Sequence, residues 1–340
     1  MLSEFSLIDR YFAQRARKNT RRAALGIGDD CALVAPFAGE MLAVSTDMLV
    51  EGRHFFADVD PHALGHKALA VNLSDLAAMG AQPLGFTLAF ALPKPEEAWL
   101  EAFSAGMFEL ADQHDCELMG GDTTAGPLNL CITVFGTVPQ DVALRRDAAQ
   151  PGDDIWVSGT PGDARAGLAF LRHEWPHAPI DATDAAYFRA ALEYPQPRVA
   201  LGLALRGVAR AALDISDGLA GDLRHILERS RVNATIDVDA LPVSPALARL
   251  PRDLQLQCAL AGGDDYELCF TAAPDQRDAV AAAAQQAGVR VTRIGTICSA
   301  SDAQPQPSSQ RPSQPTIAWR DGTGAPLNLT LQGFDHFHAD

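Results

Sequence analysis

Aspartates recur in this chain beside Gly, Ser or Thr at the ends of apolar runs. The aspartates that fit this description are Asp29, Asp30, Asp47, Asp75, Asp122, Asp214 and Asp217. Small neighbours leave a carboxylate exposed at a turn, where a ligand can reach it. Gathered carboxylates repel one another unless a cation lies between them, and hard divalent ions such as Mg²⁺ take oxygen ligands. The pattern therefore predicts a site for several metal ions, of the kind that enzymes use to hold and transfer phosphate.

The sharpest of these signals is Asp75, in the string NLSDLAAMG at 72–80. It lies among Leu, Ala and Met residues, which are typical of the inner face of a packed element. An unpaired charge is costly there, and no Lys or Arg lies within one helical turn. We therefore expect a metal ion as its partner. The alternative is an exposed Asp on a helix, with Ser74 hydrogen-bonded back along the helix.

Four other strings carry weaker signals. GIGDD at 26–30 and STD at 45–47 together offer carboxylates and hydroxyls to a metal ion, although GDD alone is typical of a solvated turn. GGDT at 120–123 either brings its backbone close to a phosphate or forms a tight hairpin-like turn. DISDG at 214–218 opens a helix, where Ser216 as N-cap and phosphate binding are compatible.

Further polar groups could meet a substrate. Arg145 and Arg146 are the basic pair best placed for phosphate oxygens, because an Arg fork binds two oxygens at once; an interdomain salt bridge is the alternative. The GGDDYE turn at 262–267 either faces a substrate or only enters a strand, and His54 follows Asp47 closely. No Ser-His-Asp or Cys-His arrangement is evident, so no covalent intermediate is expected.

Alternating strand-like and helix-like segments carry these residues. In the first half, strands are expected at 41–46, 83–92, 117–119 and 128–138, and helices at 61–80 and 96–114. In the second half, strands are expected at 155–158, 212–215, 267–271 and 290–297, and helices at 164–171, 195–209, 219–230 and 279–287. This interleaving predicts a mixed sheet and an α/β (α+β) class.

A change of character marks a domain boundary. The stretch 145–154 is polar and contains Pro151-Gly152, a plausible turn between domains. We therefore expect two domains, 1–145 and 146–340. Residues 299–315 are rich in Ser, Gln and Pro and are expected to form a flexible loop, because they bury too little apolar surface to order themselves.

Composition excludes several classes of protein. The formal charge of −16 argues against a nucleic-acid binder, which normally shows a basic face. No GxxxxGK[ST] string occurs, so P-loop chemistry is excluded. No apolar run reaches the roughly 18 residues of a membrane helix, and no secretory signal is seen, so no membrane association and a cytoplasmic location are expected. The six cysteines form no CxxC pair, which fits buried thiols in a reducing compartment.

Taken in order, GIGDDCAL, STDMLVEGRHF, ALAVNLSDLAAMGA, MGGDTT, GTPGDARAGL, LDISDGLAGDL, GGDDYELCF and GFDHF resemble the bacterial thiamine-monophosphate kinases. The resemblance covers almost the whole chain apart from 299–315. It implies a homodimer, in which the N-terminal mixed-sheet domain binds ATP and metal and forms the dimer interface, followed by a C-terminal α/β domain. It also implies direct in-line transfer from ATP to thiamine monophosphate with several Mg²⁺ ions, which yields thiamine diphosphate, the last step of its biosynthesis.

The resemblance also assigns roles to single residues. The implied metal ligands are Asp30, Ser45, Thr46, Asp47, Asp75, Asp122, Asp214 and Asp217. The implied nucleotide contacts are Gly121, Asp122, Arg146 and Ser216, the implied substrate contacts are His54, Asp264 and Phe334, and the implied catalytic residues are Asp75, Asp122 and Arg146.

Two of these positions depart from the family pattern. Asp264 stands where Glu is usual, and Phe334 stands where an aromatic with a polar tip is common. Two alternative functions remain open. One is another synthetase of the same superfamily, which activates an amide or formyl oxygen with ATP. The other is a noncatalytic metal- or nucleotide-binding protein.

Overall fold

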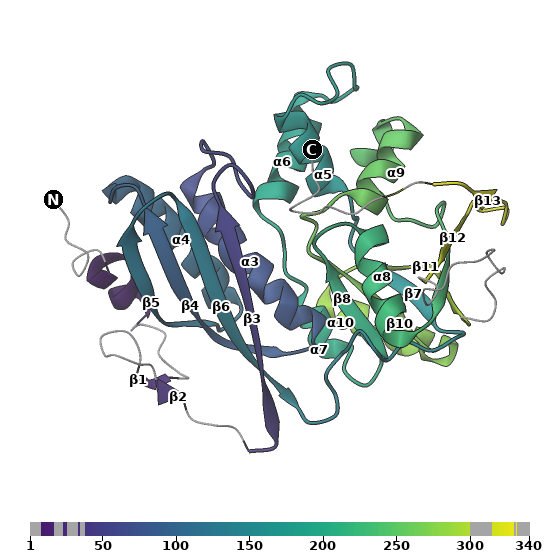
Figure 1. Ribbon diagram of the computed structural model, residues 1–340, viewed down its shortest axis with the longest axis horizontal. Coiled ribbons are helices and arrows are strands. Elements are labelled where there is room, and N and C mark those ends of the chain that lie inside the picture. Colours follow the sequence, from purple (N-terminus) through teal and green to yellow (C-terminus); the bar gives the residue numbers. More distant parts are fainter. Residues whose placement is uncertain are drawn as a thin grey trace, which may run out of the picture. The chain divides into compact units, whose positions relative to one another are not determined.

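The structure is a computed structural model that describes residues 8–16, 23–25, 33–34, 38–299, 315–329 and 331 (Figure 1). It divides into two compact units. Unit 1 comprises Met1–Leu76, Ala81–Ala143 and Glu193–Val199, and unit 2 comprises Ala77–Gly80, Leu144–Leu192 and Ala200–Asp340. The domain boundary expected after residue 145 stays a prediction. In the described part of the chain, no helix combines the length and the apolar character that crossing a membrane requires.

Unit 1 is built on a four-stranded mixed sheet, as the interleaved pattern predicts. Its order is β3 (Glu40–Val50), β6 (Asn129–Pro139), β4 (Gln82–Leu92) and β5 (Glu117–Ala125). The pairs β3–β6 and β6–β4 are antiparallel, and β4–β5 is parallel. A π-helix (Ile8–Ala13), α2 (Gln14–Ala16) and the small pair β1 (Ala23–Leu25) and β2 (Leu33–Val34) precede this sheet.

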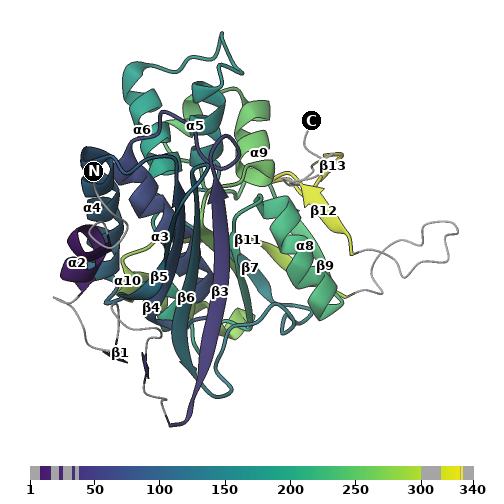
Figure 2. The same ribbon diagram turned by 60° about the vertical axis from the view of Figure 1, so that its left-hand side comes forward.

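Two long helices cover one face of this sheet, α3 (Pro61–Ala78) and α4 (Glu97–Gln113), as Figures 1 and 2 show. They approach so closely that a Cβ on Gly65 would lie 2.0 Å from the Phe103 carbonyl oxygen, and one on Gly106 would lie 2.0 Å from that of His62. Helix α3 ends in a Schellman-like turn, in which Ala81 N–H donates to the Leu76 carbonyl and Gly80 adopts a positive φ of 62°. This close packing fixes which face of α3 meets the strands.

Unit 2 contains a seven-stranded sheet that is antiparallel except for the β12–β9 pair. Its strands, in spatial order, are β13 (Pro326–Leu327), β12 (Ile317–Arg320), β9 (Asn233–Asp237), β11 (Val291–Cys298), β7 (Asp154–Ser158), β10 (Glu267–Ala272) and β8 (Ala211–Ile215). Every residue of β8 and β10 is buried, so these two strands lie in the core of the unit.

The helices of unit 2 agree only partly with the sequence pattern. They are α5 (Asp163–Leu171), α6 (Ala182–Glu193), α7 (Val199–Ala204), α8 (Leu219–Ser230), α9 (Arg252–Ala261) and α10 (Arg277–Ala287), with 3₁₀ turns at Leu247–Arg249 and Pro274–Gln276. The helix expected at 195–209 is wrong at both ends. Pro197 keeps the preceding residue out of the helical region, so α7 begins only at Val199. Helices α6 and α9 and strands β9, β12 and β13 were not expected.

Candidate functional site

The residues of β3 divide between two faces of the sheet. Side chains alternate along a strand, and here Ser45 and Asp47 are half-buried whereas Thr46 between them is exposed. The expected strand at 41–46 in fact runs from Glu40 to Val50, so these residues lie within a strand and not at its end. The prediction that Asp47 ends a strand is therefore wrong.

Helix α3 meets the inner face of β3 through polar groups. The Ser45 hydroxyl donates a short hydrogen bond to Oδ2 of Asp75, thirty residues further along the chain. One turn earlier in α3, the Asn72 side-chain oxygen accepts the backbone N–H of Asp47 at 3.2 Å. Ser45, Asp47 and Asp75 are thus brought together where strand and helix pack, and they present oxygen donors of the kind that Mg²⁺ prefers.

Two other expected ligands lie elsewhere on the sheet. The Thr46 hydroxyl is on the outer face, 2.9 Å from the Thr133 hydroxyl. Asp122 is exposed and pairs with exposed Ala89 of β4. Asp47 of the inner face is in register, through Ile132 of β6, with buried Leu88 of β4, so Ala89 and Asp122 lie on the outer face. Three strand spacings separate β5 from β3, or about 14 Å. Within unit 1 the structure therefore does not bring the side chains of Thr46 and Asp122 to Asp75.

The GGDT segment lies inside β5 and forms no turn. Gly121 has a φ of 153°, and a Cβ there would lie 2.0 Å from the carbonyl oxygen of Leu88 in the neighbouring strand. The hairpin-like alternative for 120–123 is therefore wrong. The glycine allows a close backbone approach, but the group approached is strand β4.

His54 lies in the loop after β3. Its Nδ1 accepts the backbone N–H of Val50 at 3.0 Å, which assigns the ring proton of the neutral imidazole to Nε2. The carbonyl of Val50 in turn accepts hydrogen bonds from the backbone N–H groups of Arg53 and His54. A tight loop thus holds the imidazole close to the end of β3.

In unit 2 the DISDG segment joins β8 to α8. Asp214 is buried at 6% exposure, and Ser216 and Asp217 are half-buried. The N-cap of α8 is Gly218 and no side chain caps it in the usual way, so the expected Ser216 cap is wrong. Instead, Oδ2 of Asp222 accepts the backbone N–H groups of Ser216, Asp217 and Gly218 at 3.1, 3.0 and 3.0 Å. Burial raises the pKa of Asp222 to about 7, against these hydrogen bonds, which lower it.

The GGDD turn packs directly against this segment. Asp264 N–H donates to the Ser216 carbonyl at 2.8 Å, and a Cβ on Gly263 would lie 2.4 Å from the same oxygen. Asp264 has a positive φ of 67°, and the Tyr266 hydroxyl donates to its Oδ1 at 3.2 Å. Asp214, Ser216, Asp217 and Asp264 are therefore brought together in unit 2.

Two acids that the sequence did not single out lie at the start of α5: Asp265 joins the GGDD turn to it, and Asp163 is the first residue of the helix. Asp265 accepts the Gly162 N–H at 2.8 Å at the start of α5, and desolvation raises its pKa well above the usual value. Buried Asp163 accepts hydroxyl hydrogen bonds from Thr160, Tyr187 and Ser244, and burial raises its pKa. Asp222 was also missed. Its only sequence signal is its place in LDISDGLAGDL, which does not reveal that it reaches back to the turn.

The remaining expected site residues divide into exposed and undescribed positions. Arg146 is exposed, and its guanidinium makes no ion pair with the described residues, whereas Arg145 is paired with Asp147. Asp30 and Phe334 lie outside the described residues. Across the described ranges, no group of three or more His, Cys, Asp or Glu side chains is arranged to hold a metal ion by itself.

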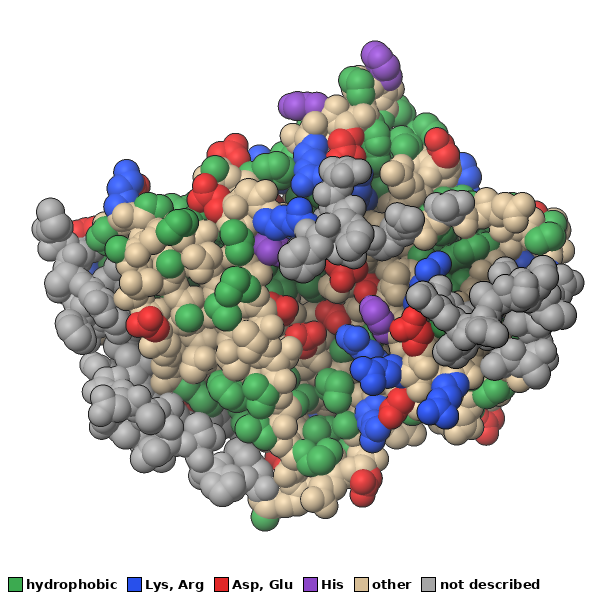
Figure 3. Space-filling view, in the orientation of Figure 1, with side chains coloured by type: hydrophobic (Ala, Val, Ile, Leu, Met, Phe, Trp, Pro, Cys, Tyr) green, Lys and Arg blue, Asp and Glu red, His purple; other side chains and the backbone are tan. Residues whose placement is uncertain are grey.

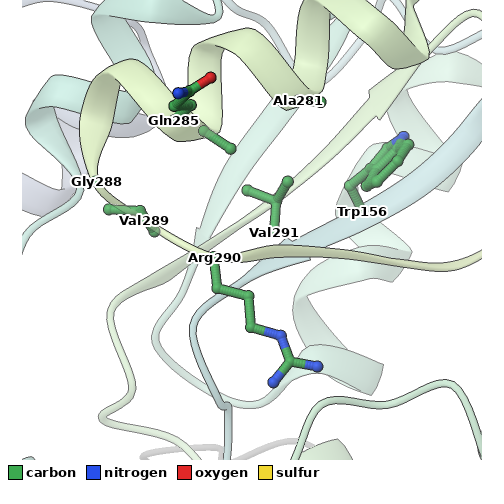
Figure 4. A pocket seen from close by; sticks show the side chains of 8 residues that line it. Trp156, Ala281, Gln285, Gly288, Val289, Arg290 and Val291 are labelled. Atoms are coloured by element: carbon green, nitrogen blue, oxygen red, sulfur yellow. The ribbon is translucent and has the colours of Figure 1, made fainter.

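A separate pocket of about 420 Å³ lies in unit 2 (Figure 4). Its lining residues are Trp156, Ala281, Ala284, Gln285, Gly288, Val289, Arg290 and Val291. None of them is an expected site residue. The lining is mainly apolar and the Arg290 guanidinium points away from Trp156, so this pocket does not suit a phosphate.

Comparison with known proteins gives two matches to family models. Residues 28–138 match the N-terminal domain of AIR synthase related proteins, and residues 150–305 match the C-terminal domain. A thiamine-monophosphate kinase of Salmonella typhimurium is 48% identical over 335 residues, which are 98% of both chains. One of Haemophilus influenzae is 42% identical over 99% of this chain and 98% of its own.

Solved structures agree with these matches. The thiamine-monophosphate kinase of Stenotrophomonas maltophilia superposes with a TM-score of 0.81 at 49% identity, covering 95% of this chain and 98% of that one. AaThiL complexed with AMPPCP and TMP gives 0.71 at 28% identity, covering 99% and 97%. The hydrogenase maturation protein HypE in complex with ATP, at 22% identity and a TM-score of 0.75, shares the fold.

Proposed function

The chain belongs to the thiamine-monophosphate kinase family, and we propose that it transfers the γ-phosphoryl group of ATP to thiamine monophosphate, forming thiamine diphosphate and ADP. The observation that carries this proposal is 48% identity to a thiamine-monophosphate kinase over 98% of both chains. The AaThiL complex with AMPPCP and TMP supports the choice of nucleotide and acceptor.

Mg²⁺ is the proposed metal because the available donors are hard oxygens. In unit 1 these are the Ser45 hydroxyl and the carboxylates of Asp47 and Asp75, and in unit 2 they are the side chains of the 214–217 segment. Mg²⁺ supplies charge neutralisation between two phosphates that otherwise repel. We propose Asp30, Thr46 and Asp122 as further ligand positions on the resemblance alone.

The proposed reaction needs no strong general base, because the acceptor is already an anionic phosphate oxygen. Phosphoryl transfer has a spread-out charge, so positioning and electrostatic stabilisation supply most of the acceleration. Arg146 is proposed to hold nucleotide phosphate with its fork, with Gly121 and Ser216 as further nucleotide contacts. His54, Asp264 and Phe334 are proposed to contact thiamine monophosphate, whose cationic thiazolium suits acidic and aromatic neighbours.

We further propose a homodimer formed through the outer face of the unit 1 sheet. On this face strand β3 exposes Leu42, Val44, Met48 and Val50, with exposed fractions of 37–60%. Figure 3 shows hydrophobic side chains on the face of this sheet that is turned to the viewer. A monomer rarely exposes so many large apolar residues on one strand, and a two-fold interface would cover the same strand in both copies.

A product assay tests the proposed activity. The full-length protein is incubated with ATP and thiamine monophosphate, with and without Mg²⁺, and thiamine diphosphate is separated by chromatography. We expect Mg²⁺-dependent formation of thiamine diphosphate and ADP in equal amounts. ATP turnover only with an amide or formyl acceptor would favour a related synthetase. Nucleotide binding without turnover on either acceptor would favour a binding protein.

The variant Asp75→Asn tests the metal role of Asp75. Its side-chain oxygen can still accept from Ser45, so the fold should persist, but kcat should fall by about 10²-fold or more because a charged ligand is lost. Asp141→Asn is the matched control. This residue is exposed with a φ of 66°, a conformation that Asn tolerates well. Near-normal turnover of Asp75→Asn would remove the assignment.

A further inference from the structure

The side chain of Asp222 reaches back to the start of its own helix. It lies in the first turn of α8, and one carboxylate oxygen accepts three consecutive backbone N–H groups, those of Ser216, Asp217 and Gly218. Asp222 is 5% exposed, so its carboxylate lies away from solvent. Its three hydrogen bonds therefore hold the backbone of the segment.

This arrangement fixes the backbone that leads into the helix. The N–H groups of Ser216 and Asp217 precede the helix, that of Gly218 belongs to its N-cap, and all three are bonded to Asp222. On the other side, the Ser216 carbonyl is taken by the N–H of Asp264. The backbone of Ser216 is thus fixed through both its donor and its acceptor.

The side chains of this segment carry oxygens that suit a metal ion. Ser216 and Asp217 are half-buried, and both carry oxygens that can ligate a hard cation. A backbone that is held at its donors and at its acceptor keeps the starting points of these side chains fixed.

We propose that Asp222 is a positioning residue for the reaction: it orients the 216–218 backbone so that Asp217 binds the divalent cation. This inference rests on the proposed function, because it assumes that Asp217 is a metal ligand.

Substitutions at Asp222 test this role, with Mn²⁺ as the spectroscopic probe and electron paramagnetic resonance as the readout of bound metal. Each full-length protein is titrated with Mn²⁺ in the presence of ADP. Asp222→Leu removes the acceptor and should weaken Mn²⁺ binding about tenfold or more, the range seen when outer-sphere partners of a metal site are lost. Asp222→Asn keeps an acceptor oxygen and should stay within about threefold of the natural protein.

Two further variants separate positioning from other roles. Asp184→Leu is the matched control, because Asp184 is also a buried acid in the first turn of a helix of unit 2, and its Arg249 partner is half-exposed. It should leave Mn²⁺ binding unchanged.

Asp222→Glu keeps the charge but moves the acceptor oxygen, so it should weaken Mn²⁺ binding. This variant replaces Asp222→Leu in the test if the Leu variant does not fold. Equal losses in the Asn and Leu variants would mean that charge or direct ligation matters, and would overturn the positioning role.

Asp217→Asn distinguishes failure of this inference from failure of the proposed function. Weakened Mn²⁺ binding in Asp217→Asn, with natural binding in Asp222→Leu and Asp222→Glu, would overturn the inference alone. Unchanged binding in Asp217→Asn would overturn the metal role of the segment as well.

Discussion

At the scale of single residues, only a hydrogen atom fits on the α-carbon of Gly121. A Cβ would lie 2.0 Å from the Leu88 carbonyl oxygen and 3.0 Å from the Leu88 nitrogen, and the φ of 153° is one that other residues rarely adopt. At the preceding Gly120, the nearest atom to such a Cβ is a methyl of Thr87, 4.0 Å away. Of these two adjacent glycines, only Gly121 is required by its surroundings to be glycine.

We predict different costs for alanine at these two positions. Gly121→Ala should destabilise the protein by about 3 kcal/mol, because strain and a backbone clash combine, and this should lower the thermal midpoint by about 5–10 °C. Gly120→Ala should shift the midpoint by no more than about 2 °C. Differential scanning fluorimetry of both variants checks this, and similar midpoints for the two would show that the close approach to β4 is unimportant.

Residue-level expectations succeeded where a local pattern was sufficient. The helical position of Asp75 follows from the apolar spacing around it, and the structure places it in α3. Its contact with Ser45 joins residues thirty positions apart, which no local pattern reveals. Asp222 was missed for a related reason. The sequence shows how far it lies from Ser216, but its side chain reaches back to the 216–218 backbone only because α8 packs against β8.

At the scale of elements, tertiary pairing overrides local preference in β5. Gly-Gly-Asp is typical of a turn, yet residues 117–125 form one strand because β4 offers partners along its length. The extent of β3 was underestimated for the same reason, since its partner β6 pairs with it from Glu40 to Val50. Helix α4 was predicted well because its apolar residues recur at helical spacing. Helix α3 is buried on nearly every side, so its prediction rests on its long run of helix-forming Ala and Leu residues and not on one apolar face.

The contact between α3, α4 and the 193–199 segment predicts acid sensitivity. His66 Nε2 donates to the Pro195 carbonyl at 2.8 Å, burial lowers the pKa of His66, and burial also lowers the pKa of His114. His62 opposes protonation of His66, and Glu109 favours it. The pKa values of these histidines are lower in the folded protein than in the unfolded chain, where they are about 6.5. Below that pH the unfolded chain binds more protons than the folded protein does. The free energy of unfolding is therefore at its full value above about pH 6.5 and decreases as the pH falls.

We therefore predict that denaturant midpoints stay level above about pH 7 and fall progressively between about pH 6.5 and 5. His66→Gln should keep a hydrogen-bond donor and flatten part of this fall. His225→Gln, at an exposed position of α8, should leave the pH dependence unchanged. Equal slopes for His66→Gln and the natural protein would exclude His66 as a source of the effect.

At the scale of the whole molecule, the exposed apolar residues of β3 predict the state of assembly. Val44→Lys with Met48→Lys places two charges on the proposed two-fold interface, so each dimer would gain four like charges. Analytical ultracentrifugation at micromolar concentration should show a dimer for the natural protein and a monomer for this variant. Phe170→Lys in unit 2, where a large apolar residue is also exposed, should remain dimeric. A monomeric natural protein would remove the proposal.

The segments of the two units alternate along the sequence, and this has a consequence for the synthesis of the chain. Unit 1 includes Glu193–Val199, and this segment provides the carbonyl that His66 binds. A nascent chain therefore cannot complete unit 1 until residue 199 has left the ribosome. By then β7, α5 and α6 of unit 2 have already emerged. The core of unit 1 is therefore completed only after part of unit 2 has been made, and a chain that ends near residue 145 lacks a segment of its first core.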